Sequence, residues 1–273
     1  MSNAQEHLKK AIKINPEFAD AHYELALILR EKKEYEDSNK HFLKTIEIRP
    51  EFSVAHFNYA LLLKEMKDYK TSKDHFHKAI DFDQNFADAH YHYGLLLADL
   101  EDYEEAKNNL EKATDIDQNY SLAYYHLAKL LIDPEDYEKA KKYYLTALDI
   151  DESLVEAHYY LGKLLSGGLK NDKDGTLIKE PEYTDAILHY KKAISINKNY
   201  AKAHYNLALV YKIQKNYNIS RKHFEKAIKI VNDYSKAHFH LAMLFKEASD
   251  VFGIKSSKPN LDVKENTSSR SKN

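Results

Sequence analysis

A pattern of 34 residues recurs in fixed register along this chain, and this repetition constrains the fold more than any other feature. The stretch from Ala201 to Tyr234 shows the pattern, numbered here from position 1 to position 34. It has an apolar residue at position 7, small residues at 8 and 20, bulky residues at 11 and 24, tyrosine at 17, alanine at 27 and an aliphatic residue at 30. Complete copies occupy residues 19–52, 53–86, 87–120, 121–154, 155–200 and 201–234. A period of this length predicts a stack of small units without one central core.

The recurring positions resemble the tetratricopeptide repeat (TPR), a helix-turn-helix unit. The small residues at positions 20 and 27 are typical of two helices that approach closely, and tyrosine stands at position 17 in every complete copy. Two departures from the family pattern are the absence of tryptophan at position 4 and the presence of proline at position 32 only in Pro16 and Pro50. The resemblance implies an all-α fold, a right-handed superhelical solenoid of TPR helix-turn-helix repeats.

We expect this solenoid to span residues 1–254. Residues 4–18 match only the second half of a repeat, and residues 235–254 match only the first half, with Val251, Phe252 and Ile254 as a short closing segment. Residues 255–273 are polar and lack periodicity, so they are expected to form a disordered tail. Because each half repeat leaves an apolar face without its partner helix, we expect weak end-to-end self-association or a capping partner.

The fifth copy carries twelve extra residues between positions 11 and 17, within residues 166–181. Three of the six glycines of the chain lie there, which predicts a loop on one rim of the solenoid. Its acidic residues faintly resemble a calcium-binding loop. With Gly175 in the sixth place, however, the acidic first and twelfth places would be taken by Lys170 and Pro181. We therefore expect no calcium site; a contact with a partner remains open.

Composition narrows the function classes. The 41 basic and 43 acidic residues give a net charge of −2 and are interspersed, so nothing favours nucleic acid or an anionic membrane as a partner. The absence of cysteine excludes disulfides, zinc-thiolate sites and a thiol nucleophile. No apolar run is long enough for a membrane span, and no leader peptide is recognisable. We expect a soluble, cytoplasmic protein.

The fifteen histidines invite a metal or catalytic interpretation, but they follow the repeat. They occupy position 4 (His22, His56, His90, His158, His204 and His238), position 23 (His7, His41, His75, His189 and His223), position 6 (His92, His126 and His240) and position 25 (His77). One histidine per repeat is what duplication of a template produces. Histidines two residues apart on a helix point about 200° apart and cannot share a metal. No catalytic or phosphate-binding motif is recognisable, so we expect neither enzyme activity, nor a metal, nor a cofactor.

The resemblance implies that the first helices of the repeats line a concave groove through positions 2, 5, 6, 9, 12 and 13. Position 5 is aromatic in all seven first helices: Tyr23, Phe57, Tyr91, Tyr125, Tyr159, Tyr205 and Phe239. Position 9 supplies Leu27, Leu61, Leu95 and Leu209, and position 6 supplies Asn58, His92, His126 and Asn206. These residues are the predicted partner-binding site. Alternatively, the rings only pack between adjacent helices, which explains the leucines less well.

The groove residues also indicate the kind of partner. Position 6 has no lysine or arginine and position 5 is always aromatic, so the carboxylate clamp of chaperone-binding family members is absent, as is a long asparagine ladder. An aromatic and aliphatic groove suits a helix or an extended segment with apolar side chains. The sequence therefore predicts a non-catalytic protein-interaction scaffold that binds a partner protein or peptide. The alternatives are the repeat arm of a larger enzyme or multiprotein assembly, and a self-assembling scaffold.

Overall fold

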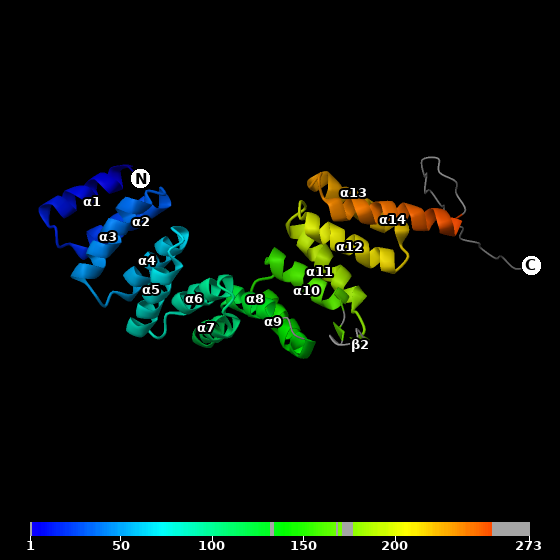
Figure 1. The fold of residues 1–273 in the computed structure, drawn as a ribbon, viewed down its shortest axis with the longest axis horizontal. Coiled ribbons are helices and arrows are strands. Elements are labelled where there is room, and N and C mark those ends of the chain that lie inside the picture. Colours follow the sequence, from blue (N-terminus) through cyan, green and yellow to red (C-terminus); the bar gives the residue numbers. More distant parts are fainter. Residues whose placement is uncertain (1, 132–133, 168, 171–176, 253–273) are drawn as a thin grey trace, which may run out of the picture. The chain divides into compact units, whose positions relative to one another are not determined.

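The computed structural model describes residues 2–131, 134–167, 169–170 and 177–252, and these form helical hairpins (Figure 1). The first helices of the repeats are α2 (Ala19–Glu31), α4 (Ser53–Glu65), α6 (Ala87–Asp99), α8 (Ser121–Leu130), α10 (Val155–Gly167), α12 (Ala201–Ile213) and α14 (Ser235–Phe252). The second helices are α1 (Ser2–Ile14), α3 (Tyr35–Ile48), α5 (Tyr69–Phe82), α7 (Tyr103–Ile116), α9 (Tyr137–Ile150), α11 (Tyr183–Ile196) and α13 (Tyr217–Ile230). A short 3-10 helix, η1 (Pro134–Asp136), precedes α9. The all-α repeat fold is thereby confirmed.

Small residues at positions 8 and 20 set the close approach of the two helices in each repeat. The hydroxyl of Ser72 on α5 donates to the backbone oxygen of Ala60 on α4 at 2.8 Å, and Ser38 and Ser220 make the equivalent bond in their repeats. In the third repeat a Cβ added to Gly94 would lie only 2.9 Å from Leu110. The helices of a repeat therefore touch along their backbones, as the sequence predicted.

In four of the six complete repeats, the turn between the two helices places position 15 in the left-handed region of backbone space. The residues with positive φ, between 61° and 66°, are Lys33, Lys67, Glu101 and Lys215. None of them is glycine, although a side chain costs free energy in this conformation. The turn is fixed by backbone hydrogen bonds, such as the one from Asp68 N–H to Leu63 O at 2.9 Å.

The second helices of the complete repeats all end at position 30, with or without a following proline. In three of the repeats without this proline, a short polar side chain at position 31 marks the helix end. Asp83, Asp117 and Asn197 each accept a hydrogen bond from the backbone N–H two residues later, at 2.9–3.0 Å. This local turn competes with further helix and so ends it.

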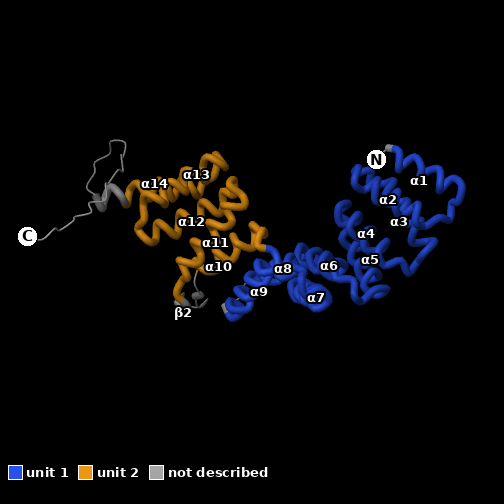
Figure 2. Tube along the Cα trace, turned by 180° about the vertical axis from the view of Figure 1, so that it is seen from behind, with its two compact units in different colours: residues 1–151 blue, residues 152–273 orange. Residues whose placement is uncertain are grey.

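The chain divides into two compact units, residues 1–151 and 152–273 (Figure 2). In each unit the core consists of position-24 side chains and the residues around them. Phe42, Phe76 and Leu110 in the first unit, and Tyr190 and Phe224 in the second, are completely buried. First helices of successive repeats also contact each other, as α2 does α4, α6 does α8, and α10 does α12.

The insertion in the fifth repeat differs from the expected loop. Its described residues form a short antiparallel strand pair, β1 (Leu169–Lys170) and β2 (Leu177–Lys179). The residues considered for calcium, including Gly175, lie outside the described part of the chain.

At the carboxyl end, α14 continues to Phe252, so Val251 and Phe252 prolong the helix and do not form a separate closing segment. The expected tail at 255–273 lies outside the described residues. No helix in the described part of the chain is both long and apolar enough to cross a membrane.

Candidate functional site

The predicted site residues lie on one side of each first helix, which we call the first-helix face and define by positions 5, 6, 9, 12 and 13. Most of the position-5 rings are too deeply buried to form an open binding surface. Phe57, Tyr91, Tyr125, Tyr159 and Tyr205 are 6–9% exposed. Tyr23 is partly buried, and only Phe239 on α14, at 60%, is well exposed.

Neighbouring rings explain this burial. The ring of Tyr91 lies 4.8 Å from that of Tyr120, at position 34 of the same repeat, and 5.8 Å from that of His126 in the next repeat. The ring of Phe57 lies 4.9 Å from Phe86 and 5.6 Å from His92 in the same way. Of the two interpretations of position 5, packing between adjacent helices agrees with these contacts.

In several repeats, the position-6 side chain contacts the position-5 ring of the repeat before it. The amide of Asn58 donates to the Tyr23 hydroxyl at 2.9 Å, and that of Asn206 donates to the Tyr159 hydroxyl at 3.0 Å. Histidine at this position packs against the ring instead. Burial lowers the pKa of His92, and it lowers the pKa of His126 to about 4. Both imidazoles are therefore neutral near pH 7.

The leucines at position 9 are the accessible apolar part of the first-helix face. Leu27, Leu61, Leu95 and Leu209 are all half-buried at the edge of the core. Each packs against a buried cluster that its own repeat shares with the next one, and each stays partly exposed. The leucines are thus more exposed than most of the position-5 rings, and they present aliphatic surface to the solvent.

Charged residues at positions 12 and 13 cross-link successive first helices, which the sequence analysis did not foresee. Lys64 Nζ lies 2.8 Å from Asp99 Oδ2, and Lys212 Nζ lies 2.7 Å from Glu247 Oε1. Arg30 Nε lies 3.4 Å from Glu65. The sequence does contain a pattern that indicates these ion pairs: a basic residue stands at position 12, and an acidic residue stands at position 13 of the next repeat.

A hollow of about 290 Å³ opens where α4, α6, α7 and α8 meet, and we call it the first-helix hollow. It is lined by Lys64, Leu95, Ala98, Asp99, Tyr103, Leu110, His126, Lys129 and Leu130. Two of these residues, Leu95 and His126, belong to the predicted site. The lining combines aliphatic side chains with the paired charges of Lys64 and Asp99 and a neutral imidazole.

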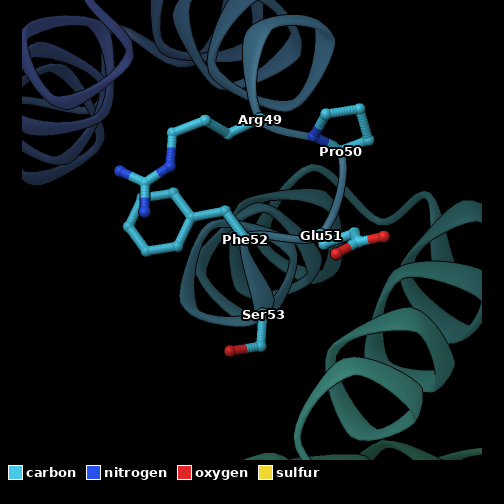
Figure 3. Close-up of a pocket in the computed structure, with 5 residues that line it drawn as sticks. All are labelled: Arg49, Pro50, Glu51, Phe52 and Ser53. Carbon is cyan, nitrogen blue, oxygen red and sulfur yellow. The ribbon is translucent and has the colours of Figure 1, made fainter.

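A second hollow, of about 420 Å³, lies at the loop between α3 and α4 and is lined by residues 49–53 (Figure 3). The guanidinium of Arg49 covers the ring of Phe52, with Cζ 4.0 Å from the ring centroid. The same guanidinium lies 2.6 Å from Asp20 Oδ1. Its one charged donor is therefore already engaged, and the hollow involves no residue of the predicted site.

The structure also shows no grouping of three histidine, aspartate or glutamate side chains that could hold a metal ion, among the residues it describes. Most position-4 histidines instead contact position 23 of the same repeat. His56 Nδ1, for example, lies 2.9 Å from His75 Nδ1. In the sequence, positions 4 and 23 are two separate columns of histidines, and only the folded hairpin brings them together.

Family models described as "Tetratricopeptide repeat" match residues 7–38, 54–86, 87–120, 122–154 and 201–234. A model described as "TPR repeat" matches residues 177–215. Together these matches cover most of the chain. None of the curated proteins compared with the chain matches it significantly.

Experimental structures with a similar fold include YrrB, described as "a TPR protein with an unusual peptide-binding site". It is 25% identical over 73% of this chain and 96% of its own, with a TM-score of 0.59. PilF of Pseudomonas aeruginosa is 19% identical over 82% of this chain and 97% of its own, with a TM-score of 0.69. MamA is 18% identical over 75% of this chain and 97% of its own, with a TM-score of 0.55.

Proposed function

Since the chain belongs to the tetratricopeptide repeat family, a family of protein-interaction folds, we propose that it is a non-catalytic scaffold that binds a peptide or helix of a partner protein on the first-helix face. The observation that carries this proposal is the first-helix hollow. It brings the half-buried Leu95 together with Ala98, Leu110 and Leu130 from three helices. The peptide-binding site named for YrrB supports the same class of function.

The chemistry of the hollow fits an aliphatic side chain of the partner. Full burial of such a side chain contributes about 1.5–3 kcal/mol. Leu27 and Leu61, in the same unit as the hollow, are half-buried at the same repeat position and add apolar surface. Lys64, Asp99 and Lys129 at its edge supply polar contacts for a peptide backbone. We therefore propose that leucines make the main contacts with the partner. The buried position-5 rings stabilise the helices that carry these leucines.

The other residues predicted at positions 6 and 9 are also proposed to contact the partner. We propose that Leu27, Leu61 and Leu209 extend the apolar surface in their repeats, and that Asn58, His92 and Asn206 contact the partner only at their exposed edges. No reaction is proposed, because eight of the histidines bond to one another in pairs, and His92 and His126 pack against aromatic rings. Cytoplasmic location and end-to-end self-association remain predictions.

A matched pair of substitutions tests the proposal. Peptides are first selected on the intact chain from a random library, and their dissociation constants are measured by fluorescence anisotropy. Leu95→Gln removes apolar contact in the hollow, so we expect binding to weaken at least tenfold. Leu145→Gln makes the same change at a leucine on α9 that is 39% exposed, and we expect less than a twofold effect. Equal affinities for both variants and the wild type would place the site elsewhere.

A further inference from the structure

Four of the six complete repeats join their two helices through a pair of histidines. Position 4 on the first helix and position 23 on the second place two Nδ1 atoms 2.8–3.0 Å apart. The pairs are His22–His41, His56–His75, His158–His189 and His204–His223. In every pair the Nε2 atom of the position-4 ring also contacts a backbone oxygen six residues earlier in the chain, at 2.8–3.4 Å.

The backbone oxygen determines where the protons of each pair reside. A carbonyl oxygen only accepts, so the Nε2–H of the position-4 ring must donate to it. A neutral imidazole has one N–H, which leaves the Nδ1 of that ring as an acceptor. The position-23 ring must then donate from its own Nδ1–H. His56, for example, donates to Pro50 O at 2.8 Å and accepts from His75.

We propose that these histidine pairs form an acid-sensitive clamp, in which each pair accepts one proton with its hydrogen bond intact and a second proton separates the two helices. The first proton binds Nε2 of the position-23 ring and leaves the bond between the Nδ1 atoms unchanged. The second would place N–H donors and positive charges on both facing nitrogens. This clamp is independent of peptide binding.

The charged groups around the pairs are lysines, which oppose a second positive charge, and carboxylates, most of which already pair with a lysine. His22 and His41 face Asp37, Lys40 and Lys9, and His56 and His75 face Asp74 and Lys78. His158 and His189 lie near Glu152 and Lys192, and His204 and His223 face Lys226 and Lys191. Two of these carboxylates already pair with lysine, Asp37 with Lys40 at 2.8 Å and Glu152 with Lys192 at 2.6 Å. The rings of Tyr59 and Tyr211 cover His75 and His223.

The direction of the pH effect follows from burial. Burial, reinforced by the partner ring, lowers the pKa of His75 and of His223 from 6.5 to about 4. The unfolded chain therefore binds more protons than the folded chain below pH 6.5. Stability is complete above pH 6.5 and declines as the pH falls toward 4. Each such group raises the unfolding equilibrium constant about thirtyfold between pH 7.5 and pH 5.

The third repeat contains a natural alternative to the histidine pair. There His90 Nδ1 lies 3.0 Å from the Oδ1 atom of Asn109. The Nδ2 atom of Asn109 donates to Glu105 O at 3.0 Å, which orients the amide with its oxygen toward His90. An amide oxygen accepts a hydrogen bond from Nδ1–H even when the imidazole is charged. With asparagine at position 23, protonation of the position-4 ring therefore does not bring two charged N–H donors to face each other.

The test transfers this alternative to the four paired repeats. The variant His41→Asn, His75→Asn, His189→Asn and His223→Asn is compared with the wild type by urea unfolding at pH 7.5 and pH 5. We expect the acid-induced rise in the unfolding equilibrium constant to be at least tenfold smaller in the variant. His7→Asn, at position 23 of the exposed half repeat, serves as control and should keep the wild-type response. If this rise is the same in the fourfold variant and the wild type, the proposal of an acid-sensitive clamp is wrong.

A second measurement decides the question even if the fourfold variant does not fold. Nitrogen NMR of the wild-type imidazoles at pH 7.5 distinguishes the two tautomers. The proposal requires Nε2–H at His22, His56, His158 and His204 and Nδ1–H at their partners. Any other protonation pattern at these pairs contradicts it.

Discussion

The position-5 ring of Tyr91 lies where two repeats meet. Tyr91 projects from α6, lies under Tyr120 and contacts His126 on α8, so it buries aromatic surface against both its own repeat and the next. Burial also raises the pKa of its hydroxyl to about 12. At this scale the ring contributes to the interface between repeats, on which the stability of such stacked units depends.

Truncation of this ring should therefore destabilise the fold. We expect Tyr91→Ala to cost about 3 kcal/mol, because it leaves a cavity between two repeats. Tyr69→Ala removes a ring that is 39% exposed at position 17 and should cost less than about 1 kcal/mol. Urea unfolding followed by circular dichroism gives both values. A Tyr91→Ala variant as stable as Tyr69→Ala would mean that the ring does not support the interface.

The sequence could place these rings on the correct side of the helix but could not decide their burial. Both interpretations put a large residue at position 5. The deciding contact comes from position 34, where another aromatic residue covers the ring. That column is readable in the sequence as Phe52, Phe86, Tyr120, Tyr200 and Tyr234. Each of these residues stands far from its partner along the chain, so only the folded hairpin shows their contact.

Helices and turns follow the repeat closely. The small residues at positions 8 and 20, and the ends of the second helices at position 30, recur from repeat to repeat because the same local contacts recur. The sequence pattern was sufficient to predict the helical hairpins. It was insufficient for the left-handed residue at position 15, because lysine and glutamate there give no glycine signal. It was also insufficient for the strand pair in the fifth repeat, since two short strands produce no periodicity.

The left-handed turn offers a test at this scale. A lysine at φ 66° carries a conformational cost that glycine avoids, so Lys67→Gly should stabilise the chain by about 0.5–1 kcal/mol. Lys78→Gly places glycine inside α5 and should destabilise it by about 1 kcal/mol. Thermal unfolding of both variants is the measurement. A lower melting temperature for Lys67→Gly would show that the lysine side chain is needed in the turn.

At the scale of the whole molecule, different residues of the first-helix face serve stability and the proposed binding. Buried rings and charge pairs join the repeats, while leucines at position 9 remain partly open. The half repeats at the two ends carry exposed apolar side chains of their own, Ile14 on α1 (85%) and Phe239 on α14 (60%). Self-association through the ends stays a prediction. Light scattering at increasing concentration measures that association separately from peptide binding.

The central claim is that a partner peptide occupies the first-helix hollow. Because the chain has no cysteine, Ala98→Cys introduces a single thiol into the hollow, and Leu145→Cys introduces one on α9 as a control. The rate of thiol alkylation is measured with and without a saturating selected peptide. We expect at least tenfold slower alkylation at position 98 with peptide and an unchanged rate at position 145. Unchanged alkylation at position 98 with the peptide bound would contradict it.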